Sequence, residues 1–157
     1  MRYIPFAAFL VFMPVALAQA QDETLFSRLS NQTLEKILKD GKIPFNKKES
    51  EVKGKTITEY IVTLGTNPGW KASLMNHGDT ISMVSFGFKT VNQQEITLER
   101  VNEWNKKNFF SIAYVDKNGF GVLAAGLDMY AGTNQKIIGE WIKMYSTDLN
   151  KFADHTK

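Results

Sequence analysis

Histidine and carboxylate side chains are the groups of this sequence that could perform acid–base or metal chemistry. The chain has two histidines and no cysteine, so thiol nucleophiles, thiolate metal sites and disulfides are excluded. His77 lies two residues before Asp79, but the sequence Asn76-His77-Gly78-Asp79 is typical of a tight turn, and we interpret His77 as a turn residue. His155 lies in the tail 153–157, which we expect to fray.

The remaining candidate acids lack the partners that catalysis requires. Asp116 is explained as a turn residue of a hairpin, and Asp128 follows a strand, where it either pairs with a base of a partner or caps a backbone group. No second carboxylate is placed for glycoside hydrolysis. The sequence contains no nucleophile elbow, P-loop, zinc-protease or dinucleotide motif. We therefore predict no catalytic residue, no metal and no cofactor, with an unrecognised enzyme as the alternative.

A helix is predicted over residues 97–107, with Thr97 as its N-cap. Four of its residues have the spacing of a buried stripe: Leu98, Val101, Asn102 and Asn105. An unpaired buried amide costs about 1–3 kcal/mol. We therefore interpret Asn102, Trp104 and Asn105 as a structural motif whose amides bond to backbone at a strand end or loop. Ligand binding is the alternative interpretation.

A β-hairpin follows over residues 109–129. Asn118-Gly119 is the strongest short hairpin signal, and a two-residue turn there would pair Val115 with Val122. One face of that hairpin would be large and belong to the core: Phe110, Ile112, Tyr114, Leu123, Ala125 and Leu127. The opposite face is small and smooth, and we predict it as a partner interface: Ser111, Ala113, Val115, Val122, Ala124, Gly126 and Asp128. A helix of the same chain is the alternative cover for this face.

The other elements place these two features in a sheet. Strand patterns over 56–64, 70–75 and 80–88 predict a three-stranded antiparallel meander. A first helix is predicted over 32–39, capped by Ser30 or Asn31, and a last helix begins after Thr133 or Asn134. The last helix has a broad apolar stripe that we expect to be buried: Ile138, Trp141, Ile142, Tyr145, Leu149 and Phe152. Phe45 is a candidate start of a short strand, and the charges of 47–55 indicate a solvated loop with Gly54 in a turn. The fold class is α+β, an antiparallel sheet with helices in the order α-β-β-β-α-β-β-α.

The N-terminus has the pattern of a secretory signal peptide. A basic Arg2, an apolar run over 4–17 and small-x-small sites that end at Ala18 or Ala20 predict cleavage after one of these alanines. The run is too short for a comfortable membrane span. We expect residues 1–20 to be removed, 21–29 to form a polar lead-in and 30–157 to form one domain of a soluble periplasmic protein. A retained membrane anchor is the alternative, and no stable span is expected after cleavage.

The charge balance argues against nucleic acid as a partner. Without Arg2, the mature chain has 18 basic and 16 acidic residues, a net charge of +2. A nucleic-acid surface requires a strong basic patch. The length of 157 residues and the 43% of hydrophobic residues are those of a single globular domain.

Three segments carry a family resemblance. Residues 98–105 contain Asn102-Glu103-Trp104-Asn105, residues 109–116 form an aromatic-small-Ala-Tyr-aliphatic-Asp strand, and residues 127–132 end a return strand with an acid. Together they resemble the YbjN family over about residues 30–152. The resemblance implies a fold like that of type III secretion chaperones, whose members are often dimers that hold a protein client. It also implies a role in regulating sensory transduction, without catalytic residues.

The leading hypothesis is therefore a non-enzymatic, exported protein-interaction, chaperone-like or regulatory module with an unknown protein client, acting as a homodimer. The alternative is a periplasmic protein that binds a small apolar ligand between the sheet and the helix of Trp104 or Trp141.

Overall fold

The computed structural model of the chain describes residues 24–52, 54–65, 70–89 and 94–157. The predicted signal peptide falls outside these ranges. The elements, in chain order, are α1 (Asn31–Asp40), β1 (Phe45–Val52), β2 (Lys55–Thr63), β3 (Lys71–Asn76), β4 (Thr80–Phe88), α2 (Leu98–Lys107), β5 (Ile112–Val115), β6 (Gly121–Asp128) and α3 (Gln135–His155). None of the helices in the described ranges has the length and hydropathy needed to cross a bilayer.

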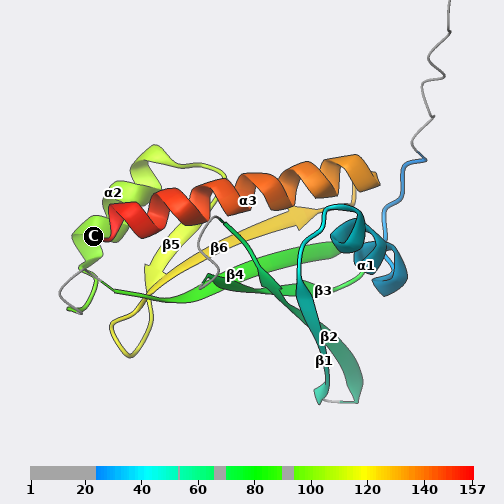
Figure 1. Cartoon of the computed structure of the whole chain (residues 1–157), viewed down its shortest axis with the longest axis horizontal. Coiled ribbons are helices and arrows are strands. Elements are labelled where there is room, and N and C mark those ends of the chain that lie inside the picture. Colours follow the sequence, from blue (N-terminus) through cyan, green and yellow to red (C-terminus); the bar gives the residue numbers. More distant parts are fainter. Residues whose placement is uncertain (1–23, 53, 66–69, 90–93) are drawn as a thin grey trace, which may run out of the picture.

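The six strands form one antiparallel sheet in the order β1-β2-β3-β4-β6-β5. Figure 1 shows the helices on one side of this sheet, with α3 lying along it, α1 near one end of α3 and α2 near the other. The chain leaves β4 through α2, enters the edge strand β5 and returns through β6, which fills the place between β4 and β5. The predicted α+β class is confirmed, with one strand more than predicted.

That additional strand is β1, which pairs with β2 from Phe45↔Val62 to Val52↔Lys55. The prediction of a solvated loop over 47–55 was wrong, although Gly54 does lie in the turn with φ +73°. Lysine and glutamate disfavour strands in isolation, but β1 is an edge strand, where charges block pairing with foreign chains. The pattern that suggested a loop is therefore the pattern of a protected sheet edge.

The helix-covered face of the sheet carries the core. The last helix has the predicted stripe, all of it buried: Ile138, Trp141, Ile142, Tyr145, Leu149 and Phe152. The Tyr145 hydroxyl donates to the carbonyl of Leu123 over 2.8 Å and lies 3.0 Å from the Ser85 hydroxyl. Burial raises the pKa of Tyr145 above its ordinary range. This contact ties α3 to both β4 and β6 through one buried side chain.

The helix ends confirm the predicted caps. The side chains of Ser30, Thr97 and Asn134 accept bonds from the backbone N–H three residues later in α1, α2 and α3. The C-terminal tail, however, does not fray, because α3 continues to His155. His155 Nε2 donates to the Arg100 carbonyl (2.8 Å), and Arg100 Nη1 donates to the His155 carbonyl (2.9 Å). This reciprocal pair fastens the end of α3 to α2.

The polar lead-in is also attached to the domain. Phe26 and Thr133 exchange two backbone hydrogen bonds of 2.8 and 2.9 Å, and Leu29 is buried. The chain therefore joins the fold several residues before α1 begins.

Candidate interaction surface

The face of the sheet opposite the helices is uncovered in the described part of the chain. The cross-strand partners Ile112↔Ala124, Ala124↔Val84, Val84↔Ser73 and Ser73↔Ile61 form one row on this face, from β5 to β2. Residues that share a row also share a face of the sheet. We call the six residues around its β4-β6-β5 end the open-face patch: Val84, Phe86, Ile112, Tyr114, Ala124 and Gly126.

The open-face patch exposes large apolar side chains. Ile112 is 63% exposed, Phe86 58% and Tyr114 45%. The register of β4 with β6 shifts between Ser85 and Phe88. Because of this bulge, Ser85 and Phe88 are both buried while Phe86 stays on the open face. Exposed apolar residues that gather on one face are typical of interaction sites.

The other end of the open face, over β2 and β3, is mixed, because Ile61 and Met75 share it with polar residues. Ser73 donates a hydrogen bond to Glu59, and Lys71 stands beside them. A shallow hollow of about 230 Å³ lies where the polar end meets the patch, lined by Glu59, Ile61, Lys71, Ala72, Ser73, Val84 and Phe86. Charged groups of the open face thus lie over β2 and β3, and the six residues of the open-face patch carry none.

The predicted interface residues are divided between the two faces. Ala124, Gly126 and Asp128 lie on the open face, whereas Val122 has the same orientation but is fully buried. Asp128 Oδ1 accepts the backbone N–H of Tyr130 (2.8 Å), which supports its interpretation as a cap. Ser111 and Ala113 are buried on the covered side, and Val115 packs against the core. The Ser111 hydroxyl donates to Asp148 Oδ2 of α3 over 2.7 Å. These seven residues therefore do not form one surface.

The physical reason is a one-residue difference in register. Val115 pairs with Gly121 and Tyr114 with Val122, so the predicted pairs were wrong by one position. The loop has three residues: Asp116 N–H donates to the Phe120 carbonyl (2.8 Å), and Gly119 has φ +77°. A slip of one residue moves a whole strand to the other face. Ile112 and Tyr114, expected in the core, consequently lie on the open face.

One signal in the sequence could have revealed the longer loop. Asp116 is the preferred first residue of a type I turn, and a glycine three positions later suits the left-handed residue of a three-residue loop. Asp116 Oδ1 accepts the backbone N–H groups of Phe120 and Asn118, both at 2.9 Å, and these bonds lower the pKa of the carboxyl. The prediction considered only the Asn118-Gly119 pair, which favours a two-residue turn.

The predicted structural motif on α2 is confirmed for one amide. Asn105 accepts the N–H of Ala113 (2.8 Å) and donates to its carbonyl (3.0 Å), so it pairs with the start of β5 as a strand would. Asn102 and Leu98 are exposed, and the buried residues of α2 are Val101 and Trp104. The predicted buried face of α2 was therefore wrong by a rotation about the helix axis: Trp104, and not Asn102, is buried beside Val101. Its ring packs edge-on against Phe152 at 5.1 Å.

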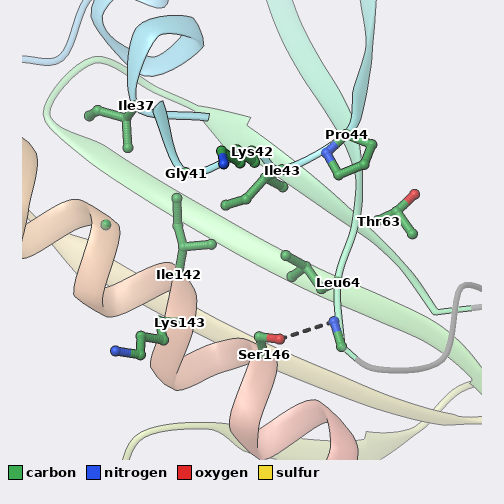
Figure 2. Close-up of a pocket in the computed structure, with 12 residues that line it drawn as sticks. Ile37, Gly41, Lys42, Ile43, Pro44, Thr63, Leu64, Ile142, Lys143 and Ser146 are labelled. Atoms are coloured by element: carbon green, nitrogen blue, oxygen red, sulfur yellow. Dashed lines mark hydrogen bonds between the residues drawn. The ribbon is translucent and has the colours of Figure 1, made fainter. Parts of the chain in front are cut away.

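The titratable groups are dispersed. Among the described residues, no group of three histidines or carboxylates lies close enough to hold a metal ion. His77 Nε2 is 3.3 Å from the Ser82 hydroxyl in the turn between β3 and β4. Trp104 and Trp141 are both packed in the core, 3% and 5% exposed. A pocket of about 430 Å³ lies elsewhere, between α1, the end of β2 and α3 (Figure 2).

Comparison with known proteins gives one match. The model of the YbjN family, described as "Putative bacterial sensory transduction regulator", matches residues 31–157. No curated protein and no solved structure matches the chain.

Proposed function

The chain belongs to the YbjN family, and we propose that it is a non-enzymatic, exported module that regulates or chaperones through contacts with other protein chains. Family membership supports a regulatory or protein-interaction role in general terms. The finer statements, which are export to the periplasm, self-association and a protein client, are our proposal. The open-face patch is the observation on which the proposal rests.

Self-association is the arrangement that the patch favours. The large side chains Phe86 and Tyr114 share the open face with the small residues Ala124 and Gly126, so a second copy related by a two-fold axis could place large groups over small ones. The six residues of the patch carry no charge, so two copies would meet without like-charge repulsion. Two sheets stacked face to face lie about 10 Å apart, which the exposed side chains would fill.

The test is the molar mass of the mature protein over a wide range of concentration. We expect a dimer that dissociates on dilution, and Phe86→Ser should weaken it by at least about tenfold, as loss of a buried aromatic anchor does. Met144→Ser is the matched control, because Met144 is 50% exposed but lies on α3, on the other side of the sheet. A dimer that both substitutions weaken equally would place the interface elsewhere.

A client is tested in the same preparation. The mature protein should retain a periplasmic protein in a pull-down, and Phe86→Ser should release it if client and second copy use the same patch. A wild-type protein that is monomeric at every concentration and retains no protein would contradict the proposal.

Export is tested by fractionation and by the intact mass of the recovered protein. We expect a periplasmic protein whose N-terminus follows Ala18 or Ala20. A cytoplasmic protein that begins at Met1 would show that the apolar N-terminus is not a signal peptide.

A further inference from the structure

The pocket between α1 and α3 is built from apolar side chains and is separate from the open-face patch. Figure 2 shows Ile37, Ile43, Leu64 and Ile142 around it; they come from α1, the segment before β1, the first residue after β2, and α3, respectively. Its volume of about 430 Å³ lies within the range of small-molecule sites. The Ser146 hydroxyl at its rim accepts the backbone N–H of Gly65 over 3.0 Å.

A glycine in the second turn of α3 extends the pocket into a trough. Gly139 borders both this pocket and a neighbouring hollow of about 250 Å³, and the two share Ile37 and Gly41. Glycine weakens a helix interior, and a Cβ placed on Gly139 would meet no atom within 4 Å. Packing within the chain therefore does not require glycine at this position. The bare helix backbone gives a ligand room to lie against α3.

A lysine occupies an unfavourable backbone conformation at the pocket. Lys42 has φ +53°, a left-handed value that glycine or asparagine normally supplies at the end of a helix. The bonds from Ile43 N–H to the Leu38 carbonyl (2.9 Å) and from Lys42 N–H to the Lys39 carbonyl (3.0 Å) complete this helix end. Gly41, one residue earlier, has an ordinary helical φ of −75°. A non-glycine residue at positive φ is the kind of outlier that gathers at functional sites.

Basic side chains surround the trough. Lys42 and Lys143 line the pocket, and Lys136 lines the neighbouring hollow. Asp40, which also lines the neighbouring hollow, is paired with Lys36, and Glu140 is paired with Lys143 at 3.7 Å, so Lys143 already has a carboxylate partner. Lys42 has no ion pair within the described part of the chain. In the described part of the chain, Lys42 and Lys136 are therefore the lining cations without an ion pair, while the walls are apolar.

We propose that this trough, which we call the α1–α3 trough, binds a small amphiphile with an unbranched apolar chain and a carboxylate, such as a medium-chain fatty acid. The chain would lie along Ile37, Ile142 and the bare backbone at Gly139. The carboxylate would face Lys42. The apolar walls favour the chain, and the cations favour an anionic head over a neutral or positive one. This site is independent of the proposed self-association.

The experiment titrates the mature protein with decanoate, decanol and decyltrimethylammonium, followed by calorimetry and amide chemical shifts. We expect decanoate to bind at least several-fold more tightly than decanol, with weaker binding at high salt. The cationic amphiphile should bind most weakly. Equal binding of decanoate and decanol, or no binding of decanoate at millimolar concentration, would overturn the proposal.

Two variants locate the site without unfolding the protein. Gly139→Leu introduces a better helix former into open space and fills the trough, so decanoate binding should be lost while the fold is retained. Lys42→Gly suits the left-handed position, and it should reduce the preference for decanoate over decanol while decanol binding is unchanged. Phe86→Ser should leave both affinities unchanged. Binding that survives Gly139→Leu but is lost in Phe86→Ser would place the amphiphile on the open-face patch and refute the assignment.

Discussion

The two faces of the sheet use the same strands and differ in what covers them. Along β6, Leu123 and Ala125 point into the core under α3, whereas Ala124 and Gly126 lie on the open face. The covered face is filled by large side chains and fixed by buried polar bonds, among them Tyr145 to Leu123 and Ser111 to Asp148. In the described ranges, the open face has exposed apolar groups, and its side-chain hydrogen bond from Ser73 to Glu59 is only partly buried. The covered face therefore determines the stability of the monomer, and the open face is free to serve contacts with other chains.

The largest expected effect separates the faces directly. Leu123→Ala removes a fully buried side chain from the covered face and should lower the free energy of unfolding by about 2–5 kcal/mol. Ile112→Ala on the open face should change the stability of the monomer by no more than about 0.5 kcal/mol. Denaturant titration at low protein concentration measures both. A large loss for Ile112→Ala at low concentration would mean that the open face is part of the core.

Leu123→Ala and Ile112→Ala also distinguish the two faces of the sheet when stability is measured at high protein concentration. If copies associate through the open face, the apparent stability of the wild type rises with protein concentration. Ile112→Ala should flatten that rise, while Leu123→Ala should shift the whole curve downward. Parallel curves for Ile112→Ala and the wild type would place association on another surface.

The amides of α2 give a second contrast. Asn105→Ala leaves the N–H and carbonyl of Ala113 without their partner and should cost about 1–3 kcal/mol. Asn102→Ala, at an exposed position of the same helix, should change stability by no more than about 0.5 kcal/mol. Thermal or denaturant unfolding of both variants checks the difference. Equal losses would show that Asn105 does not brace β5.

The two amides also illustrate what local sequence could predict. The need of a buried amide for a backbone partner was deduced correctly for Asn105, because that reasoning depends only on hydrogen bonding. Periodicity alone did not fix the rotation of α2, because the stripe with Trp104 and the stripe with Asn102 both fit a helix. The large ring of Trp104 contributes more buried area, so it determines which side of α2 faces α3.

Tertiary pairing explains the other differences. The caps and the stripe of α3 were predicted because they depend on neighbouring residues along one helix. The strand β1 was missed because its formation depends on pairing with β2 rather than on its own residues. The division of the hairpin between two faces depended on one loop residue between Asp116 and Phe120. The trough has no local signal, since Lys42 and Gly139 meet only in the folded chain.

Alkaline pH probes the hydroxyls that the covered face encloses. Burial, together with a hydrogen bond to Glu35, raises the pKa of Tyr60 to about 12. Its pKa in the unfolded chain is about 10, so the unfolded state loses the proton first as the pH rises. The contribution of Tyr60 to the free energy of unfolding is therefore complete below pH 10 and decreases as the pH approaches 12. The raised pKa of Tyr145 has the same effect on stability. Tyr60→Phe should make the stability less dependent on pH in this interval, as measured by denaturant titration. An unchanged pH profile would contradict this assignment.

The smallest effect comes from two glycines of β6 that face opposite sides. A Cβ on Gly121 would lie 2.5 Å from Ile96 Cδ1 and 3.1 Å from Phe88 Cβ, so Gly121→Ala should destabilise the monomer. A Cβ on Gly126 would meet only the Ile81 carbonyl oxygen at 4.0 Å, so Gly126→Ala should be neutral or stabilise by up to about 1 kcal/mol. Thermal unfolding of the dilute protein measures whether each variant is more or less stable than the wild type.

For Gly126→Ala, the sign of the change in monomer stability is more informative than its magnitude, because it can be compared with the effect on self-association. If a second copy places a large side chain over Gly126, the added methyl group should weaken self-association even though it does not destabilise the monomer. The molar mass of Gly126→Ala at high concentration should then shift toward that of the monomer. A variant that is at least as stable as the wild type and associates equally well would show that the small residues of the patch do not receive a partner. The apolar groups around them would then need another occupant.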